Sequence, residues 1–476
     1  MNLARTIAGL AAAFVVAVIA VPAAAATLSV IGANAKVCQL TGQTDWLTGE
    51  TTDARTEARY GLQGVDLGFP VESGDDALYF LFGDAVPNGH PPGAYPTVPP
   101  DDAMGRTKRT AAPDPKTCLD LDLVGPGHIS FGHPTVTPAI QQGSFNVPSG
   151  GVAVDGRVYA FFWTDHCVIP DPFGPNSVTP LKLPTPPPGG VCPETAVNNS
   201  LGMSVLAYAS PSSPLAFTQV APPIAVAYVP QMPAGFVYVT AAAPPPPSRI
   251  PGVDYRPGYE APIPVFGVAR YRQSIPYLAM APRATFGDFT SWRFYAGTGA
   301  SGPIWVSYQQ WQSGRVGGQW APPPGAQLYA NSPNPYSPSG DERCVGEHSV
   351  TWNAPLQAWL LLYSCGGWQV EARTAPDPWG PWSGPTVLLS AVKNPGLFCT
   401  LFWNKPGAGG CPGLVSQQIP VLSFGYFYAP FVISRFTEEA MPSGIAPARR
   451  ATIYWLLSTW DPYQVTVMRS TLELTP

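Results

Sequence analysis

Charged residues are scarce in this sequence. Asp, Glu, Lys and Arg make up 12% of the 476 residues, and the formal net charge is −5. Nucleic-acid-binding proteins gain most of their affinity from contacts between basic residues and the phosphate backbone. No stretch of this chain forms a basic patch that could make such contacts. We therefore expect no nucleic-acid partner.

Patterns typical of metal sites and of helices are missing as well. The eight cysteines include no Cys-x-x-Cys pair, and no Cys/His cluster has the spacing of a zinc site. We expect no metal and no cofactor, although the alternative of a structural ion on the axis of the fold stays open. Beyond the N-terminus almost no segment has an apolar period of 3.6 residues, and the chain contains 60 prolines and 48 glycines. An α/β fold is therefore excluded.

The N-terminus holds the one long apolar run, from Ile7 to Val21. Arg5 precedes this run, and the small residues Ala23 to Ala26 follow it, as at a signal-peptide cleavage site. This pattern predicts a signal peptide over residues 1–26 and an exported protein over residues 27–476, with no membrane span after cleavage. An uncleaved membrane anchor is the alternative, although the run is short for a membrane span.

The even number of cysteines in an exported chain favours disulfides. Three pairs are close in sequence and are plausible local bridges, and the fourth pair is what remains. These pairs are Cys399 with Cys411, Cys167 with Cys192, Cys344 with Cys365, and Cys38 with Cys118. Sequence alone does not fix this connectivity.

A repeated hairpin pattern indicates the fold. Residues 61–84, GLQGVDLGFPVESGDDALYFLFGD, combine a glycine-flanked strand, a polar turn and an apolar strand, and residues 145–165 repeat this arrangement. Related units follow at 235–282, 346–365 and 425–458. We predict an all-β fold, a single five-bladed β-propeller over residues 27–476 with long Pro/Gly-rich loop insertions.

The rival fold is a pair of β-sandwiches. The propeller is favoured because polar residues recur on the first strand of each unit, and in a propeller this strand lines the central channel. Leu28 to Leu40 is predicted to be a strand that pairs with the last blade and closes the ring.

Two acids on first strands, Asp66 and Glu347, are the main catalytic candidates, and Asp84 ends the first hairpin. A glycosidase needs two carboxyl groups, one to protonate the leaving oxygen and one to activate water or attack the anomeric carbon. A carboxylate within an apolar strand is costly to bury unless it is paired or solvated, so its position points to function. The alternatives are turn or capping aspartates and an exposed edge glutamate.

Cationic and aromatic residues complete the candidate site. Arg270 and Arg272 are predicted to lie on one face of a strand, where they would hold sugar hydroxyls or favour the ionised form of an acid; a structural ion pair is the alternative. The other substrate-binding candidates are Trp163, Asp165, His348 and Trp352. The 14 tryptophans and 20 tyrosines suit a sugar-binding cleft, although packing between sheets explains most of them.

Four motifs carry a resemblance to a known family. They are GVDLGFPVESGDDALYFLFGD at 64–84, FGVARYRQSIPYLAMAP at 266–282, GEHSVTWNAPLQAWLLLYSC at 346–365 and WGPWSGP at 379–385. Together they resemble a secreted bacterial family that was long catalogued as a domain of unknown function and that includes endo-D-arabinanases. The resemblance implies a five-bladed propeller that hydrolyses α-D-arabinofuranosyl linkages in the arabinogalactan and lipoarabinomannan of mycobacterial-type envelopes.

The resemblance also implies site residues and a setting. By position it assigns the acids to Asp66, Asp84 and Glu347, with Arg270 and Arg272 nearby. The sequence departs from the family pattern at Val65, directly before Asp66, and at Ala85 and Val86, directly after Asp84. These departures put the shape of the subsites in question.

We expect a secreted or envelope-associated monomer that acts on arabinan, with Asp66 as the base and Glu347 as the acid. The competing function is a non-catalytic envelope or glycan-binding propeller.

Overall fold

The computed structural model is an all-β chain in which successive strands form five sheets of four or five strands each and one small two-stranded sheet. Asp165, Cys167, Cys192 and the predicted signal peptide up to residue 25 lie outside the described residues. The structure describes residues 26–73, 76–89, 101–124, 146–164, 203–210, 212–220, 232–244, 261–316, 319–334, 337, 340–366, 368–407, 410–419, 424–441 and 448–476.

The five large sheets are the blades of a β-propeller, and each uses consecutive strands, except that the last blade also includes the N-terminal strand. The first blade consists of β2 (Leu62–Glu72), β3 (Leu78–Pro87), β4 (Asp101–Thr107) and β5 (Asp122–Leu123). The second consists of β6 (Asn146–Val154), β7 (Arg157–Thr164), β8 (Met203–Ser210) and β9 (Ser213–Gln219). The third consists of β10 (Tyr238–Ala241), β11 (Ile263–Val268), β12 (Tyr277–Ala281), β13 (Arg293–Gly299) and β14 (Gly302–Ser307).

The last two blades complete the ring. The fourth consists of β17 (Val345–Asn353), β18 (Ala358–Cys365), β19 (Gln369–Ala375) and β20 (Thr386–Ser390). The fifth consists of β21 (Tyr426–Val432), β22 (Glu438–Glu439), β23 (Arg449–Trp460), β24 (Gln464–Thr475) and β1 (Thr27–Gln39). The first strands contact one another in the order β2, β6, β10, β17, β21 and back to β2, so they surround a common axis.

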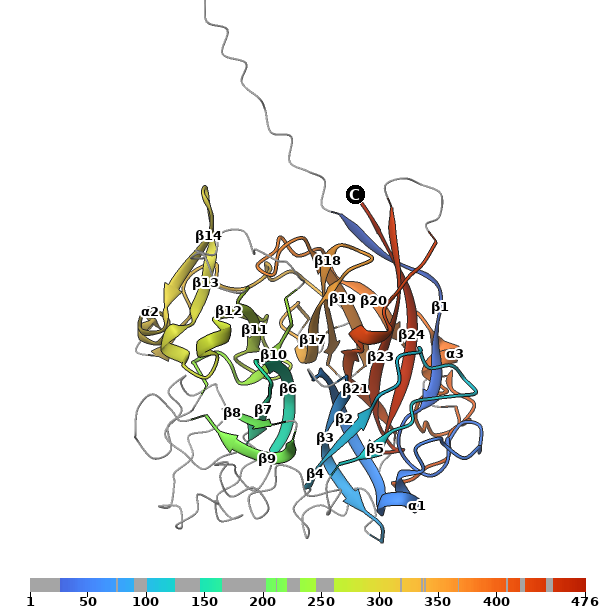
Figure 1. Cartoon of the computed structure of the whole chain (residues 1–476). Helices are drawn as coiled ribbons and strands as arrows, with labels where there is room; N and C mark the ends of the chain where they lie inside the picture. The colour runs from blue at the N-terminus through green and yellow to red at the C-terminus, as the bar shows by residue number, and fades with distance from the viewer. Residues whose placement is uncertain are drawn as a thin grey trace, which may run out of the picture.

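The N-terminal strand closes the ring. β1 pairs antiparallel with β24, from Thr27 opposite Thr475 to Gln39 opposite Thr466, and Figure 1 shows the blue and red ends of the chain side by side. Closure satisfies backbone groups that would otherwise form an exposed sheet edge. The predicted five-bladed propeller and its closing strand are therefore confirmed.

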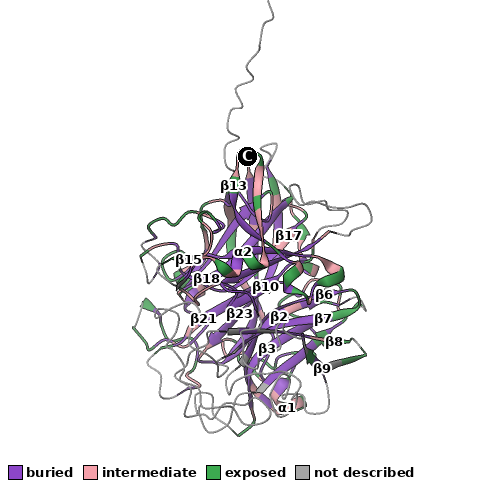
Figure 2. Cartoon of the chain, turned by 90° about the vertical axis from the view of Figure 1, so that its left-hand side faces the viewer, coloured by how far each residue is buried: buried purple, intermediate pink, exposed green. Residues whose placement is uncertain are grey.

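Blade packing explains why several strands are apolar without alternation. Every residue from Leu78 to Phe82 in β3 is buried, as is every residue of β18, because neighbouring blades cover both faces of the sheet. Figure 2 shows the strands buried over most of their length. A strand covered on both faces gains from apolar side chains at every position, so it loses the alternation of a half-exposed strand.

The third blade differs from the prediction. Its innermost strand is the short β10, and β11 is the second strand. Arg270 and Arg272 follow the end of β11 at Val268 and lie in a bend, not on one face of an inner strand. The start of this unit at 235–241 is as predicted, but Arg270 and Arg272 do not lie on its inner strand.

The helices are short and connect strands. They are α1 (Thr56–Tyr60), α2 (Tyr308–Ser313), α3 (Pro395–Phe398) and the 3-10 turns η2 (Arg283–Thr285), η3 (Phe289–Ser291) and η5 (Ser434–Phe436). The small sheet pairs β15 (Arg315–Val316) with β16 (Gln319–Trp320). None of the helices among the described residues has the length and apolar character needed to cross a bilayer.

Three of the four expected disulfides are present, and the fourth pair lies outside the described residues. The three bridges are Cys38–Cys118, Cys344–Cys365 and Cys399–Cys411. The first bridge ties the closing strand β1 to the segment between β4 and β5. The second bridge includes Cys344, which directly precedes the strand β17 that contains Glu347.

Candidate active site

A cavity of about 320 Å³ opens where the inner strands of several blades meet. All three acids from the sequence prediction line it. Its lining residues are Asp66, Leu67, Asp84, Val147, Trp163, Tyr238, Tyr271, Arg272, Glu347, Tyr426, Tyr428 and Trp460. The volume falls within the usual range for small-ligand sites.

Asp66 is presented by an irregular part of β2. The pairing of β2 with β3 shifts register on both sides of Asp66 and Leu67, and Leu67 adopts a left-handed conformation with φ 60°. Such a conformation costs a residue with a Cβ about 1–2 kcal/mol. The hydrogen bond from Leu67 N to Ser458 Oγ, at 2.8 Å, holds this bulge against β23.

Because Gly83 has no side chain, the carboxyl group of Asp66 can lie close to its backbone. The two residues are paired between β2 and β3, and a Cβ on Gly83 would lie 3.0 Å from Asp66 Oδ1 and 2.8 Å from Leu67 Cδ1. The glycine before Asp84 is therefore required by the close approach of the two strands.

Burial favours the protonated form of Asp66. The residue is 6% exposed, and Oδ2 accepts a hydrogen bond from the Tyr428 hydroxyl at 2.7 Å. Burial raises the pKa of Asp66 to about 7; hydrogen bonds from Tyr428 and Tyr463 lower it in part, and the charge of Glu347 raises it further. The influence of Glu347 indicates that the two carboxyl groups share one electrostatic environment.

Asp84 is the second buried acid of the cavity. It is 8% exposed and has a positive φ of 47° directly after Gly83. Burial raises the pKa of Asp84 well above its usual value, and the nearby charge of Asp66 raises it further. Asp84 and Asp66 therefore lie close enough for the charge of Asp66 to disfavour ionisation of Asp84.

Glu347, on β17, has different surroundings. It is 2% exposed, and Oε1 accepts hydrogen bonds from the Tyr271 hydroxyl and from Arg272 Nη2, the latter at 3.1 Å. Oε2 accepts a hydrogen bond from the Ser364 hydroxyl. Donors on both oxygens, one of them a cation, are the pattern of a bound carboxylate.

The chain positions Arg272 through its own backbone. Arg272 N donates to Val345 O at 2.9 Å, and Arg272 has a φ of 56°. A Cβ on Gly346 would lie 2.9 Å from Arg272 Cγ, so this glycine allows the guanidinium to reach Glu347. Burial lowers the pKa of Arg272, but the charge of Glu347 together with smaller effects of nearby tyrosines outweighs burial and leaves the pKa above its usual value.

Aromatic rings form much of the remaining wall. Trp163 lies 4.5 Å from Tyr271 between ring centroids, and Trp460 stacks with Tyr426 at 6.1 Å. Tyr238 contacts both Trp163 and Tyr271. Rings beside carboxyl groups provide the apolar faces and polar edges that suit a sugar.

Several predicted site residues lie elsewhere. Arg270 is in the bend after β11, where its backbone N and O both bond to the Ser274 hydroxyl, and it does not line the cavity. Trp352 packs on Trp359 toward the other end of β17 from Glu347. Neither Arg270 nor Trp352 therefore lies with the three acids in this cavity.

His348 is also absent from the cavity wall. Successive side chains of a strand point to opposite faces, so the residue next to Glu347 faces away from it. Its ring is fully buried with Nδ1 3.0 Å from Gly346 O, and burial lowers the pKa of His348 to about 4.

The tyrosines of the cavity were not among the predicted site residues. Tyr271, Tyr426 and Tyr428 lie in or beside motifs that it noted, yet their hydroxyl groups were not identified as partners of the acids. The available signal was the Tyr-x-Tyr pattern at the start of β21, which places both rings on one face.

One group of potential metal ligands occurs among the described residues, formed by Cys344, Cys365 and Glu371. The two cysteines are joined in a disulfide, so their sulfurs are not thiolates and are poor ligands. This group lies outside the lining of the acid cavity.

No curated protein matches the chain. Among solved structures, three with a similar course of the chain align over most of this chain and most of their own length. A Bacteroides ovatus protein described as a hydrolase shares 11% identity, with 86% of each chain covered and a TM-score of 0.40. The catalytic domain of a GH62 α-L-arabinofuranosidase from Coprinopsis cinerea shares 10% identity, with 92% of this chain and 97% of that chain covered and a TM-score of 0.34. An α-L-arabinofuranosidase from Clostridium thermocellum shares 8% identity, with 83% and 94% covered and a TM-score of 0.34.

The family comparison concerns the second half of the propeller. The matched region runs from β11 to β24 and includes Arg272, Glu347 and Tyr428. Three of the four motifs that carry the resemblance, those at 266–282, 346–365 and 379–385, fall inside it. Over residues 263–469 the chain thus matches the family described as "Domain of unknown function (DUF4185)".

Proposed function

We propose that the protein is an exported glycoside hydrolase that cleaves α-D-arabinofuranosyl linkages of mycobacterial-type arabinan. The observation that carries this proposal is a single cavity with carboxyl groups in two contrasting environments. Asp66 and Asp84 have raised pKa values, whereas Glu347 is bonded to a guanidinium and two hydroxyl groups. Such a contrast separates a proton donor from a proton acceptor at one pH.

The surroundings of the carboxyl groups favour roles opposite to those expected from the sequence. A general acid is most effective when its pKa is near the working pH, and a pKa of about 7 suits Asp66 for protonating the leaving oxygen. Glu347 would act as the base that activates water or as the nucleophile. Asp84 would orient the sugar or Asp66.

Hydrogen bonds around Asp66 support this assignment. After Asp66 gives up its proton, the Tyr428 hydroxyl 2.7 Å from Oδ2 stabilises the carboxylate that forms. Arg272 holds Glu347 in place by a hydrogen bond at 3.1 Å, and the aromatic wall would hold the sugar ring over both acids. This chemistry uses side chains of the chain itself.

The substrate class comes from the motifs that resemble endo-D-arabinanases, and the site chemistry is compatible with it. The cavity is lined by rings and hydroxyl groups, and Arg272 is its one guanidinium group among the lining residues. This composition favours an uncharged sugar over an acidic one, because the charge of Arg272 is already matched by Glu347. We propose that the protein acts as a secreted or envelope-associated monomer.

An aryl α-D-arabinofuranosyl oligosaccharide with an activated leaving group tests both the reaction and the roles. An activated group leaves without protonation, so Asp66→Asn should keep most of its activity on this substrate while losing about 100-fold or more on the natural linkage. Glu347→Gln should lose activity on both. Wild-type protein that cleaves neither substrate would exclude the enzyme, and the reverse pattern in the two variants would reverse the roles.

The second candidate function is a non-catalytic glycan-binding propeller. The half-buried and buried rings around the cavity favour it, since they would bind a sugar without any proton transfer. Saturable binding of arabinan by the wild-type protein with no released product, in the pH range around 7, would favour this function.

A further inference from the structure

A polar groove of about 620 Å³ lies beside the acid cavity. Seven of its side chains are amides or acids, and a tryptophan ring stands among them. These residues include Trp46, Glu57, Gln63, Gln417, Gln418 and Gln464. Amide side chains both donate and accept hydrogen bonds, as sugar hydroxyls do.

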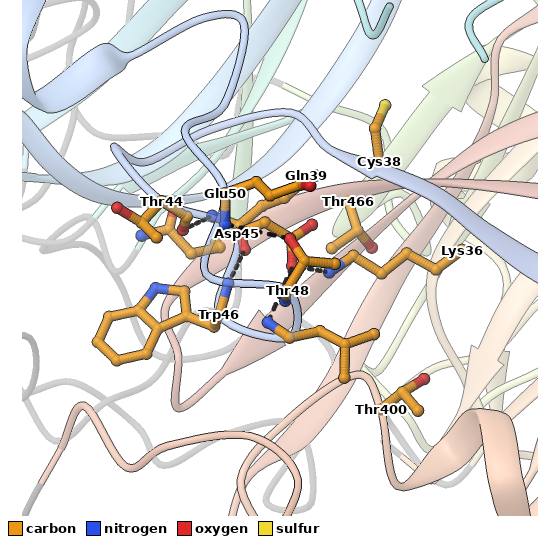
Figure 3. Close-up of polar contacts among 12 residues, drawn as sticks. Lys36, Cys38, Gln39, Thr44, Asp45, Trp46, Thr48, Glu50, Thr400 and Thr466 are labelled. Atoms are coloured by element: carbon orange, nitrogen blue, oxygen red, sulfur yellow. Dashed lines mark hydrogen bonds and ion pairs between the residues drawn. The ribbon is translucent and has the colours of Figure 1, made fainter. Parts of the chain in front are cut away.

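The turn that presents Trp46 is fixed in place. Lys36 Nζ lies 2.8 Å from Asp45 Oδ1 in a largely buried ion pair, and the same oxygen accepts a bond from Leu47 N at 2.9 Å. Trp46 N donates to Gln39 Oε1 at 3.2 Å. Figure 3 shows the Trp46 indole on the opposite side of this turn from Lys36.

The indole of Trp46 is half-buried, and no aromatic ring of the described residues packs on it. This distinguishes it from Trp163 and Trp460, whose rings stack within the cavity wall. A fixed aromatic face among amide groups is the arrangement that stacks on a sugar ring while its hydroxyls are bonded.

The groove and the acid cavity share one hairpin turn. Trp460, at the end of β23, lines the cavity, and Gln464, at the start of β24, lines the groove. Gln464 Nε2 donates to Gln63 O at 2.9 Å, and Gln63 precedes Asp66 by three residues on β2. Three strand residues span roughly 10 Å, a distance that a short run of linked sugars covers.

We propose that this groove is a second carbohydrate subsite, in which Trp46 stacks on a sugar of the same chain that occupies the acid cavity. The inference rests on the proposed function for the identity of the sugar, an α-D-arabinofuranosyl chain. The protein would then bind long oligosaccharides more tightly than short ones, because a ligand must reach both the cavity and the groove to gain the second contact.

Binding of α-D-arabinofuranosyl oligosaccharides of increasing length, measured by calorimetry, tests the inference. Trp46→Ala should weaken binding of long oligosaccharides by about tenfold, the scale of one aromatic contact, and leave short ones unchanged. Trp46→Phe keeps a stacking face and should recover most of the affinity, which separates stacking from a folding defect. Trp352→Ala is the matched control, a half-buried tryptophan at the far end of β17.

Each outcome decides the question. Equal affinity of Trp46→Ala and wild type for long chains, an equal loss for short chains, an equal loss in Trp352→Ala, or no binding of any oligosaccharide by the wild type overturns the inference. Hydrolysis is scored separately in the same samples. Length-dependent loss in Trp46→Ala without any product from the wild type would support the subsite and refute the proposed catalysis.

Discussion

Replacing Asp66 with Asn should stabilise the protein near neutral pH while it abolishes protonation of the leaving group. The carboxyl is 6% exposed, and burial is the main cause of its raised pKa. Asn has nearly the same shape and can still accept the Tyr428 hydroxyl bond. The variant therefore removes the cost of burying a charge and keeps the main contact.

The magnitude follows from the pKa. The ordinary value of 3.8 rises to about 7 in the folded protein, which corresponds to about 4 kcal/mol at roughly 1.4 kcal/mol for each tenfold change in proton affinity. The new amide group needs a partner of its own, so we expect a net gain of about 2–4 kcal/mol.

The sign of the pH dependence is specific. Because the folded pKa lies above the unfolded one, the native state binds the proton more tightly than the unfolded state. The wild type therefore loses stability as pH rises from about 4 to about 7, and the loss is complete above pH 7. Asp66→Asn lacks this term, so its advantage is absent near pH 4 and full at pH 8.

Thermal unfolding at pH 4 and pH 8 measures the effect. Asp66→Asn should unfold at a higher temperature than the wild type at pH 8 and at the same temperature at pH 4. Asp76→Asn is the control, since Asp76 is exposed and has a positive φ that Asn tolerates. A lower melting temperature for Asp66→Asn at pH 8, or the same shift at both pH values, would refute the reasoning.

Three further predictions concern the surroundings of the acids. Arg272→Met removes the cation from Glu347 and should lower turnover in steady-state assays by about 10- to 100-fold, which is the contribution of a hydrogen bond to a charged group. Arg272→Lys should restore little of the lost turnover. Gly83→Ala places a Cβ 3.0 Å from an oxygen of Asp66 and should abolish most activity, while circular dichroism stays that of a β-protein. Replacing both Cys344 and Cys365 with Ser removes a disulfide between residues 21 positions apart and should lower the free energy of unfolding by about 3 kcal/mol. An unchanged midpoint in denaturant titrations would contradict this prediction.

Local sequence signals were sufficient for the blades that begin with a hairpin. In the first and fourth blades, glycine-flanked strands, polar turns and apolar second strands lie close in sequence, and β2 with β3 and β17 with β18 follow these patterns. Ring closure by β1 was also predictable, because an unpaired final blade would leave an exposed edge.

The details of the site depend on contacts that no local pattern records. The left-handed conformation of Leu67 comes from packing against Ser458, which lies on another strand of the ring. Likewise the pairing of Arg272 with Glu347 requires two blades to meet, so no local pattern distinguishes Arg272 from Arg270 as the partner of the acid. The proposed reversal of the acid and base roles rests on that pairing together with the burial of Asp66.

Digestion of purified arabinogalactan, followed by chromatography of the released sugars, tests the central claim most directly. The wild-type protein should release arabinose-containing oligosaccharides at neutral pH, and Glu347→Gln, which keeps the shape of the side chain but not its charge, should release none. A wild type that releases nothing, or a Glu347→Gln variant as active as the wild type, would contradict the account.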